Sequence, residues 1–283
     1  MSRFLITGAA GMLGRDLQLA LRDRDVTALG RADLDITDPD AVDAAVAGHD
    51  VVVNSAAYTK VDDAETHEDE AAAVNATGPA LLAEAAVRHG AKLVTISTDY
   101  VFDGNGTAPY AEDAPTDPIN AYGRTKAAGE AAVRRIAPDS SYVVRTAWIY
   151  GAHGPNFAAT MLRLAASHDT VSVVTDQVGQ PTWTGELAAR IVELVDADAP
   201  AGTYHGTNAG QASWYDFTRA IFAESGLDPE RVLPTDSAAF VRPAPRPAYS
   251  VLGHEGWSRA GLAPMRDWRE ALAAAVQAGA LAR

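Results

Sequence analysis

The sequence predicts an α/β fold, a Rossmann-like doubly wound parallel sheet with a smaller C-terminal α/β lobe. Three observations predict it. Apolar, β-rich runs alternate with helical patterns over the first half of the 283-residue chain. A glycine-rich turn, Gly8–Gly14, separates the first apolar run from the first helical pattern. After Tyr150 the alternation loosens, and Pro, Gly and Trp become frequent.

The first half supplies the elements of the sheet. The apolar runs expected to form strands are Phe4–Thr7, Val26–Leu29, Val51–Asn54, Leu93–Ser97 and Tyr142–Thr146. The helical patterns between them are Met12–Arg22, Asp40–Ala47, Ala71–Arg88 and Tyr122–Ile136. Continuous apolar strands that alternate with helices indicate a parallel sheet covered on both faces. Right-handed crossovers then place ligands along the carboxyl ends of the strands.

The second half is expected to be helical with short strands. Its helical patterns are Asn156–Ser167, Thr184–Val195, Trp214–Glu224 and Asp267–Ala278. The segment Thr235–Tyr249 carries three prolines, which exclude it from a helix or a central strand. We divide the chain into residues 1–150 and residues 151–283, and expect some segments of the second part to return to the first.

Composition excludes several classes of protein. The chain has no cysteine, so disulfides, thiolate metal sites and thiol nucleophiles are excluded. A net charge of −14 argues against nucleic-acid binding, which needs a basic face. No apolar run approaches the roughly 20 residues of a membrane span. The chain begins directly with a strand pattern that leaves no room for a signal peptide, so we expect a cytoplasmic protein.

The turn Gly8-Ala-Ala-Gly11-Met12-Leu13-Gly14 indicates a nucleotide site. Glycines allow a tight turn and close approach of the backbone to a pyrophosphate, which then rests on the free N–H groups of the following helix. The spacing of these glycines resembles the extended branch of the short-chain dehydrogenase/reductase superfamily. That resemblance makes residues 1–150 an NAD(P)-binding domain. It implies further cofactor contacts at Asp35, Ile36, Ser55, Ala56, Ala57 and Tyr58.

Arg31, just after the second predicted strand, bears on the choice of cofactor. An acidic residue there commonly binds the ribose hydroxyls of NAD, whereas an arginine can pair with the 2′-phosphate of NADP. Arg31 therefore favours NADPH. NADH stays open, because Asp33 and Asp35 nearby could serve the ribose and a loop arginine can simply be solvated.

Tyr122 and Lys126 are the strongest catalytic candidates. Residues four apart lie on one face of a helix, and Asn120 could cap that helix. A tyrosine with a cation one turn away can donate a proton to a carbonyl oxygen, provided that its pKa is lowered from about 10. Thr98, at a predicted strand end, would orient Tyr122 or the carbonyl oxygen. Lys126 would also hold the nicotinamide ribose.

A succession of longer motifs resembles the family of dTDP-4-dehydrorhamnose reductases. The motifs are Ser97–Gly104, Asn120–Lys126, Arg145–Tyr150, Asn156–Phe157, Asp176–Thr182 and Arg246–Pro247. Tyr100 stands where the related sugar-nucleotide dehydratases carry glutamate, so dehydration is disfavoured. The resemblance implies reduction, by NADPH or NADH, of the C4 ketone of a dTDP-4-dehydro-6-deoxy sugar.

The same resemblance implies residues that bind the dTDP-sugar. They are Val61, Asp62, Thr98, Asp99, Tyr100, Trp148, Asn156, Gln177 and Arg246. Some members of the family hold Mg²⁺ at a dimer contact built from glutamates. Glu186 and Glu270 lie in comparable stretches, but the second stretch departs from the glutamate-rich form, so we expect no metal. The chain is expected to be a monomer or a homodimer.

Two other functions remain open at this stage. A reductase of a related keto-sugar from secondary metabolism would carry the same residues, because few side chains set the pocket. A catalytically silent nucleotide-binding subunit would keep the fold but tends to lose the Tyr–Lys pair, which is present here as Tyr122 and Lys126.

Overall fold

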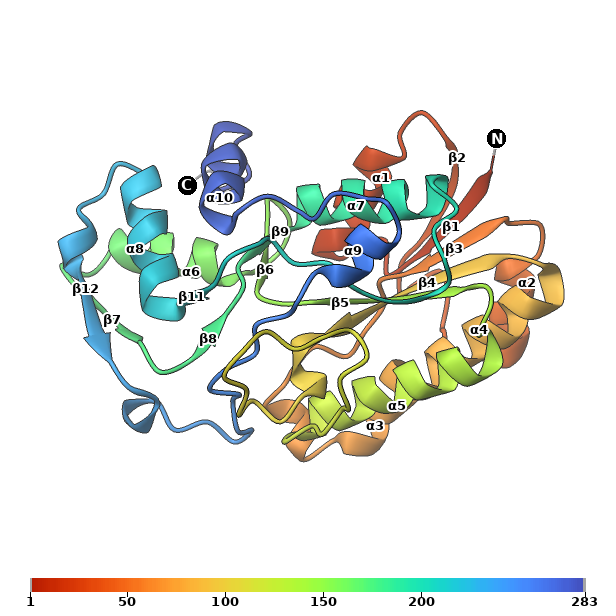
Figure 1. The fold of residues 1–283 in the computed structure, drawn as a ribbon, viewed down its shortest axis with the longest axis horizontal. Helices are drawn as coiled ribbons and strands as arrows, with labels where there is room; N and C mark the ends of the chain where they lie inside the picture. The colour runs from red at the N-terminus through yellow and green to blue at the C-terminus, as the bar shows by residue number, and fades with distance from the viewer. Residues whose placement is uncertain (1, 282–283) are drawn as a thin grey trace.

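The computed structural model describes residues 2–281 and shows two unequal lobes lying side by side (Figure 1). The larger lobe is a parallel sheet between two layers of helices. The smaller lobe packs helices against short two-stranded sheets. The predicted α/β fold class is confirmed.

The main sheet fixes where a ligand can bind. Across residues 2–281 it has six parallel strands in the order β10-β5-β4-β3-β1-β2. They are β1 (Arg3–Thr7), β2 (Asp25–Leu29), β3 (Val51–Asn54), β4 (Lys92–Thr98), β5 (Ser141–Thr146) and β10 (Gly202–His205). The first five match the predicted strands closely. The chain runs from β1 to β2 on one side and then crosses to β3 on the other side, so the strand order reverses at β1 and β3, the position where sheets of this kind bind ligands.

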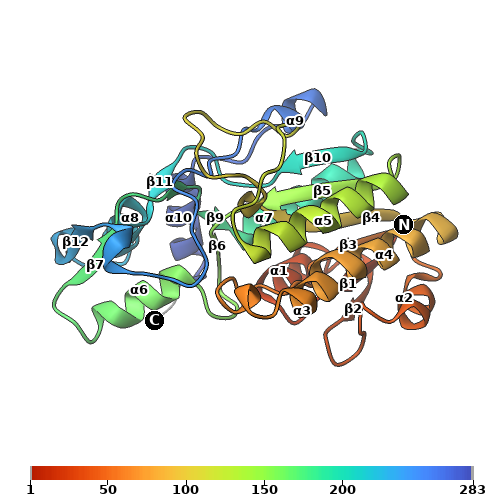
Figure 2. The same ribbon diagram turned by 90° about the horizontal axis from the view of Figure 1, so that it is seen from below.

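Helices cover both faces of the main sheet, as Figure 2 shows from below, and alternate side chains of the strands pack against different helices. Phe4 and Ile6 of β1 pack toward α1 (Met12–Ala20) and α7 (Thr184–Asp196). Leu5 points to the opposite face. That face is covered by α2 (Pro39–Val46), α4 (Gly78–His89) and α5 (Ala121–Ile136).

One predicted helix is interrupted. The continuous pattern predicted at Ala71–Arg88 is divided into α3 (Glu68–Ala72), a π-helical turn (Ala73–Thr77) and α4 (Gly78–His89). Pro79 has no N–H to donate to the carbonyl of Asn75, so the regular ladder is broken there. The amide of Asn75 instead bonds both backbone groups of Tyr58, at 2.8 and 3.1 Å.

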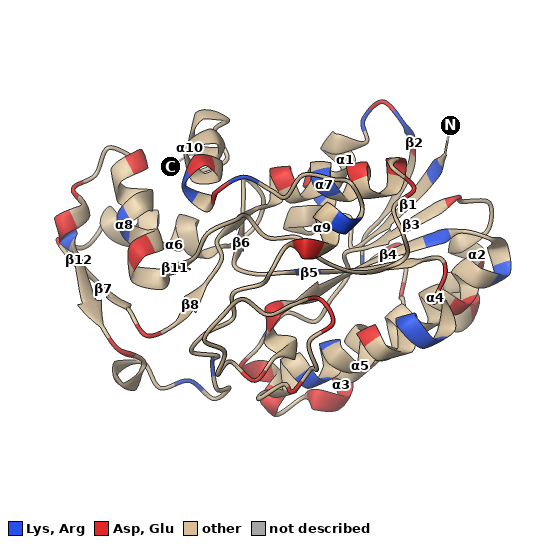
Figure 3. Ribbon diagram, viewed as in Figure 1, with Lys and Arg blue, Asp and Glu red and all other residues tan. Residues whose placement is uncertain are grey.

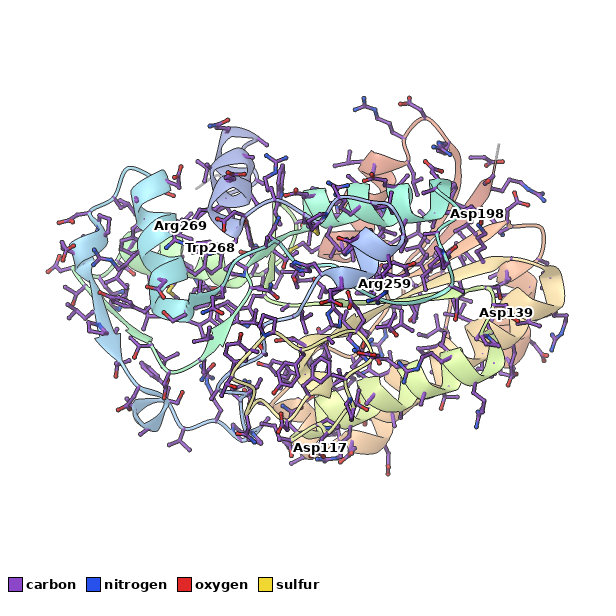
Figure 4. All side chains as sticks on the ribbon, in the orientation of Figure 1. Asp117, Asp139, Asp198, Arg259, Trp268 and Arg269 are labelled. Carbon is purple, nitrogen blue, oxygen red and sulfur yellow. The ribbon has the colours of Figure 1, made fainter. Side chains whose placement is uncertain are left out.

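The smaller lobe confirms the helices predicted after residue 150. They are α6 (Phe157–Ala165), α8 (Trp214–Glu224) and α10 (Trp268–Gln277), with α7 returning to the larger lobe. The short sheets pair β6 (Ile149–Tyr150) with β9 (Thr182–Trp183), β7 (Val171–Val174) with β12 (Val232–Thr235), and β8 (Val178–Gly179) with β11 (Ala212–Ser213). Trp268, labelled in Figure 4, is fully buried in this lobe.

Two late segments return to the larger lobe. Strand β10 adds the outer strand of the main sheet beside β5, and α9 (Glu255–Arg259) packs on the same face as α1. The proline-rich segment predicted to be irregular holds only the 3-10 turn η5 (Ser237–Ala239) before it runs back between the lobes (Figure 1). The remaining 3-10 turns are η1 (Asp63–Glu65), η3 (Asp99–Val101) and η4 (Pro229–Arg231).

Charged residues of both signs occur in both lobes (Figure 3). Figure 3 shows acidic residues on helices of both lobes, with basic residues between them rather than gathered on one face. Within residues 2–281, no helix is both long enough and apolar enough to cross a membrane.

Candidate active site

Helix α5, which carries the predicted catalytic pair, is positioned by the residues at its start. Asn120 caps it as predicted, since the side-chain oxygen accepts from the Gly123 N–H at 2.8 Å. The side-chain NH₂ group of Asn120 donates to the Pro245 carbonyl oxygen at 2.9 Å. This hydrogen bond connects the proline-rich segment to the start of the helix. Gly123 has no room for a side chain, because a Cβ there would lie 2.1 Å from the Tyr100 carbonyl oxygen. The start of α5 therefore packs closely against η3, the turn that directly follows β4.

Tyr122 lies at the carboxyl end of β4. Burial raises its pKa to about 12, while a hydrogen bond with Thr98 lowers it and the charge of Asp99 raises it. The ring of Tyr100 meets Tyr122 edge to face, with centroids 5.8 Å apart. The structure thus brings together Thr98, Tyr100 and Tyr122, and it keeps the tyrosine as a neutral proton donor.

Lys126 lies one turn further along α5 and is almost fully buried. Its ammonium donates to the Ile96 carbonyl oxygen at 2.6 Å. Burial lowers the pKa of Lys126 to about 8, and the carboxylate of Glu130 works in the opposite direction. We expected the lysine to lower the pKa of Tyr122. Burial instead dominates both groups, and it moves their pKa values apart, upward for Tyr122 and downward for Lys126.

Asp99 is a buried carboxyl group in the same cluster. Its Oδ1 accepts a hydrogen bond from the Thr98 hydroxyl at 2.9 Å. Burial raises the pKa of Asp99 to about 6, and hydrogen bonds with Ser250 and Thr98 lower it. The Thr98 hydroxyl oxygen also accepts from the Tyr100 N–H at 3.2 Å, so the strand end is held in one conformation.

The glycine-rich turn has the close packing that a phosphate site needs. Gly8 has a left-handed φ of 68°, and a Cβ on it would lie 2.5 Å from the Ala56 nitrogen. A Cβ on Gly14 would lie 2.4 Å from the Gly8 oxygen. Gly11 is the N-cap residue of α1 and provides no side-chain cap. The N–H groups at the start of this helix, which opens with Met12 and Leu13, therefore meet no capping side chain. The turn fits a bound pyrophosphate.

The segment after β3 lies beside this turn. The Ser55 hydroxyl donates to the Thr7 carbonyl at 2.7 Å, and the Ala56 N–H donates to the Asn54 side chain at 3.2 Å. Ala57 leads to Tyr58, whose hydroxyl donates to Asp63 and whose ring packs in one cluster with Tyr122. This loop connects the glycine turn with the reacting centre.

The residues expected near the adenosine end of the cofactor follow β2. Arg31 is exposed, and its charge acts on Asp35 across this loop. The Asp35 carboxylate accepts from the side chain and the backbone of Thr37, which lowers its pKa. Ile36 is buried against Gly78, where a Cβ would lie 2.6 Å from the Ile36 side chain.

Two predicted substrate residues, distant in the sequence, form an ion pair. Arg246 lies 2.9 Å from the Asp62 carboxylate, and its guanidinium also donates to the Ala244 carbonyl. The Ala244 N–H donates to the same carboxylate oxygen at 3.3 Å. Val61 precedes Asp62 and is half-buried. The pair joins the loop after β3 to the proline-rich segment.

The remaining predicted substrate residues belong to the smaller lobe or its edge. Trp148 stacks on Trp214, and Gln177 accepts from the Trp214 indole N–H at 3.2 Å. Within residues 2–281, the side-chain hydrogen bonds of Asn156 go to other partners. Its oxygen caps α6 through the Ala159 N–H, and its amino group donates to the Gly151 carbonyl. The amide of Asn156 is committed to holding α6.

Glu186, one of the two glutamates considered above for a metal, already has hydrogen-bond partners within the chain. The Glu186 carboxylate already accepts from Asn208 at 2.9 Å and from Arg266 at 3.1 Å. Over residues 2–281, no three His, Cys, Asp or Glu side chains come together as a metal site. A carboxylate neutralised by arginine is a poor partner for a divalent cation.

Sequence reasoning missed three residues around the site. Asn75 joins the Tyr58 backbone to the Thr125 hydroxyl of α5 at 3.1 Å. Glu130, one turn beyond Lys126, forms a buried bidentate pair with Arg145 at 2.8 and 2.9 Å. Trp214 stacks on Trp148. Helical spacing could have pointed to Glu130, but the other two contacts join distant segments and leave no local signal.

Taken together, these side chains can protonate an oxygen beside a bound dinucleotide, which is the chemistry of an NAD(P)H-dependent oxidoreductase of the short-chain dehydrogenase/reductase type. The family described as "RmlD substrate binding domain" matches residues 2–280. The chain belongs to this family. The resemblance to dTDP-4-dehydrorhamnose reductases that the motifs predicted is confirmed.

Relatives and a solved structure agree with this family. A dTDP-4-dehydrorhamnose reductase of Streptomyces griseus is 55% identical, over 95% of this chain and 91% of that protein. A probable dTDP-4,6-dihydroxy-2-methyloxan-3-one 4-ketoreductase of Streptomyces antibioticus is 56% identical, over 95% of this chain and 93% of that protein. The structure of a Bacillus anthracis dTDP-4-dehydrorhamnose reductase in complex with NADP matches with a TM-score of 0.93 and 38% identity, over 98% of this chain and 99% of that one.

Proposed function

We propose that this protein reduces the C4 ketone of dTDP-4-dehydro-L-rhamnose to give dTDP-L-rhamnose, with NADPH as the reductant. The placement of partly buried Tyr122 and buried Lys126 near Thr98, on the edge of the sheet that carries the glycine turn, supports it. The names of the Streptomyces griseus and Bacillus anthracis relatives support the substrate, and the NADP bound to the latter supports the cofactor.

Each catalytic residue has a separate task in this reaction. The nicotinamide, when bound, supplies the hydride that reduces the ketone carbon. Tyr122 donates its proton to the ketone oxygen, and Thr98 orients that oxygen and the tyrosine by hydrogen bonding. Lys126 holds the cofactor ribose and, as a cation, stabilises the tyrosinate that remains. Solvent protons then return to Tyr122 through Lys126.

The substrate is held between the lobes in this proposal. Residues 1–150 bind the cofactor, and residues 151–283 mainly bind the dTDP-sugar. Asp99, Tyr100 and Trp148 contact the sugar, with Val61 and Asp62 lining its pocket, while Gln177 and Arg246 reach the nucleotide diphosphate or the base. Asn156 acts on that end of the ligand through the start of α6. The oligomeric state, monomer or homodimer, stays a prediction.

A related dTDP-keto-sugar is the second candidate substrate. The name of the Streptomyces antibioticus relative, a 4-ketoreductase of a different dTDP-sugar, favours it at an identity as high as that of the rhamnose-pathway relatives. A silent nucleotide-binding subunit is disfavoured, because Tyr122 and Lys126 are both present on one turn of α5.

The first test follows the absorbance of NADPH during incubation with dTDP-4-dehydro-L-rhamnose made in situ by a 3,5-epimerase. Oxidation that requires both the keto-sugar and the epimerase, with dTDP-L-rhamnose as product, is the expected result. Oxidation with other dTDP-4-keto-sugars alone would move the assignment to the second candidate. Tight NADPH binding without oxidation of any keto-sugar would indicate the silent subunit.

Arg31→Ala tests the cofactor preference. We expect the dissociation constant for NADPH to rise about tenfold and that for NADH to change little, because only NADPH carries the 2′-phosphate that the guanidinium can pair with. Titration of both reduced cofactors by fluorescence measures this. Equal losses for the two cofactors would contradict a phosphate contact at Arg31.

A further inference from the structure

The backbone of Trp148 is held in an unfavourable conformation. Its φ is 45°, and among residues 2–281 only Asp198 shares a positive φ without being glycine. A bulky residue in the left-handed region is strained, so the surrounding contacts must hold it there. The Trp148 carbonyl accepts from the Thr182 N–H at 3.2 Å, which anchors the backbone. The indole is held by two further contacts.

The first contact is with Trp214. The two indoles are nearly parallel, at 8°, with ring centroids 3.5 Å apart. Trp214 is the first residue of α8, directly after Ser213, whose side chain forms a reciprocal capping box with Asp216. The Trp214 indole N–H also donates to Gln177. A capped helix end and this hydrogen bond therefore fix the ring on which Trp148 stacks.

The second contact is with Gly179. A Cβ at this position would lie 2.6 to 2.8 Å from Cε2, Cζ2 and Nε1 of Trp148. The φ of Gly179 is not positive, so the backbone does not require glycine there. The close approach of the Trp148 indole is what requires glycine at this position. Gly179 pairs with Ala212 of β11, and β11 leads directly into Trp214. The β8–β11 pair and the start of α8 therefore form one unit that provides both contacts with Trp148.

This unit acts on the reacting centre from the neighbouring strand. Trp148 follows Thr146 by two residues, and Thr146 is in register with Thr98. We infer that Trp214 and Gly179 are positioning residues, which form a slot that holds the Trp148 indole against the sugar of the substrate. This inference rests on the proposed function, because it takes Trp148 as a sugar contact.

The test compares dTDP-L-rhamnose with dTDP, since only the former carries the sugar. Calorimetry would measure both dissociation constants, with NADPH present, for Trp214→Leu, Trp214→Phe, Gly179→Ala and Trp148→Leu. Phe157→Leu is the matched control. Its ring also packs on Trp214, with centroids 4.3 Å apart, and its loss removes comparable apolar contact from the same cluster. Circular dichroism would follow the exciton coupling of the stacked indoles.

We expect Trp214→Leu and Gly179→Ala to weaken dTDP-L-rhamnose about tenfold while dTDP and NADPH change by less than about twofold. Trp214→Phe should recover most of the loss, because it restores a stacked ring. In steady-state kinetics KM should rise and kcat should stay near that of the parent protein. The exciton signal should disappear in both Trp214 variants and persist in Phe157→Leu, which should bind the sugar normally.

Three results would overturn the inference. The Trp214 and Gly179 variants could bind dTDP-L-rhamnose normally while Trp148→Leu does not, so that the slot would not matter. Phe157→Leu could lose as much as Trp214→Leu, which would indicate general damage to the lobe. Trp148→Leu could also bind normally, so that no sugar contact exists at this residue. Failure of the proposed function is a separate observation, because it would appear as an inactive parent protein in the NADPH assay.

Discussion

The two lobes build their parts of the site in different ways. The proposed cofactor side, in the larger lobe, consists of segments that are short and local, such as the turn Gly8–Gly14 and one turn of α5. The proposed substrate side, at the smaller lobe and its edge, depends on contacts between distant segments, such as Trp148 with Trp214. A site built from neighbouring residues needs only the correct residues at the correct spacing. A contact between distant segments also requires that every element between them packs correctly.

The lobes also differ in where they place charge. In the larger lobe, desolvation moves the pKa values of Tyr122 and Lys126, the proposed catalytic residues, in opposite directions. The ion pair between Asp62 and Arg246, at the junction of the lobes, keeps both side chains partly exposed. In the proposed function, the ionisable groups of the larger lobe therefore take part in catalysis, and the ion pair at the junction of the lobes takes part in substrate recognition.

The sharpest test of the catalytic side is Tyr122→Phe. We expect kcat to fall by about 100-fold or more, because the proton donor is lost, while NADPH binding stays unchanged. Stopped-flow measurement of hydride transfer and fluorescence titration of NADPH would check the two halves of this statement. Retention of more than a few per cent of the parent rate would remove Tyr122 as the donor.

Gly14→Val tests the proposed cofactor side by disrupting the glycine turn alone. A Cβ there would lie 2.4 Å from the Gly8 oxygen, so the turn must open and the phosphate site is lost. We expect the dissociation constant for NADPH to rise about 100-fold, measured by calorimetry. Gly226→Ala, in the smaller lobe, has no atom near the added Cβ and should leave NADPH binding intact. A similar loss in both variants would indicate global destabilisation.

The pKa of Lys126 makes a prediction for the pH profile. Because burial lowers it to about 8, the amine loses its charge in the free enzyme as the pH rises through that value. The charged form is the one that supports Tyr122, so kcat/KM should fall about tenfold per pH unit above pH 8. Glu130→Gln removes the carboxylate that raises the lysine pKa and should shift this limb to lower pH. A profile unchanged by that variant would assign the limb to another group.

The smallest effect is expected for Asp62→Asn at the junction of the lobes. In the ligand-free protein the Asp62 carboxylate neutralises Arg246, which the proposed function assigns to the diphosphate or the base. Removing the charge frees the guanidinium, so KM for the dTDP-sugar should fall about twofold, as for a partly exposed ion pair. Steady-state kinetics with the keto-sugar would measure it. A rise in KM would show that the loss of the Asp62 carboxylate from the sugar pocket outweighs the gain from the freed guanidinium.

Much of the fold could be predicted because it depends on local patterns. The first five strands and most helices followed from hydrophobic periodicity, and Asn120 from its place before a helix. The helix predicted at Ala71–Arg88 was wrong in its continuity, since Pro79 breaks the ladder and Asn75 turns toward Tyr58. Strand β10 was missed because its four residues join the sheet from a distant part of the chain.

The sequence by itself determined the glycine turn, the spacing of Tyr122 and Lys126, and the family motifs, because each depends on residues that are neighbours along the chain. Only the tertiary structure decided that Asp62 meets Arg246, that Gly179 makes room for Trp148, and that burial raises one catalytic pKa and lowers the other. The physical reason is that desolvation and close packing belong to the folded assembly of distant segments. No short stretch of residues contains them.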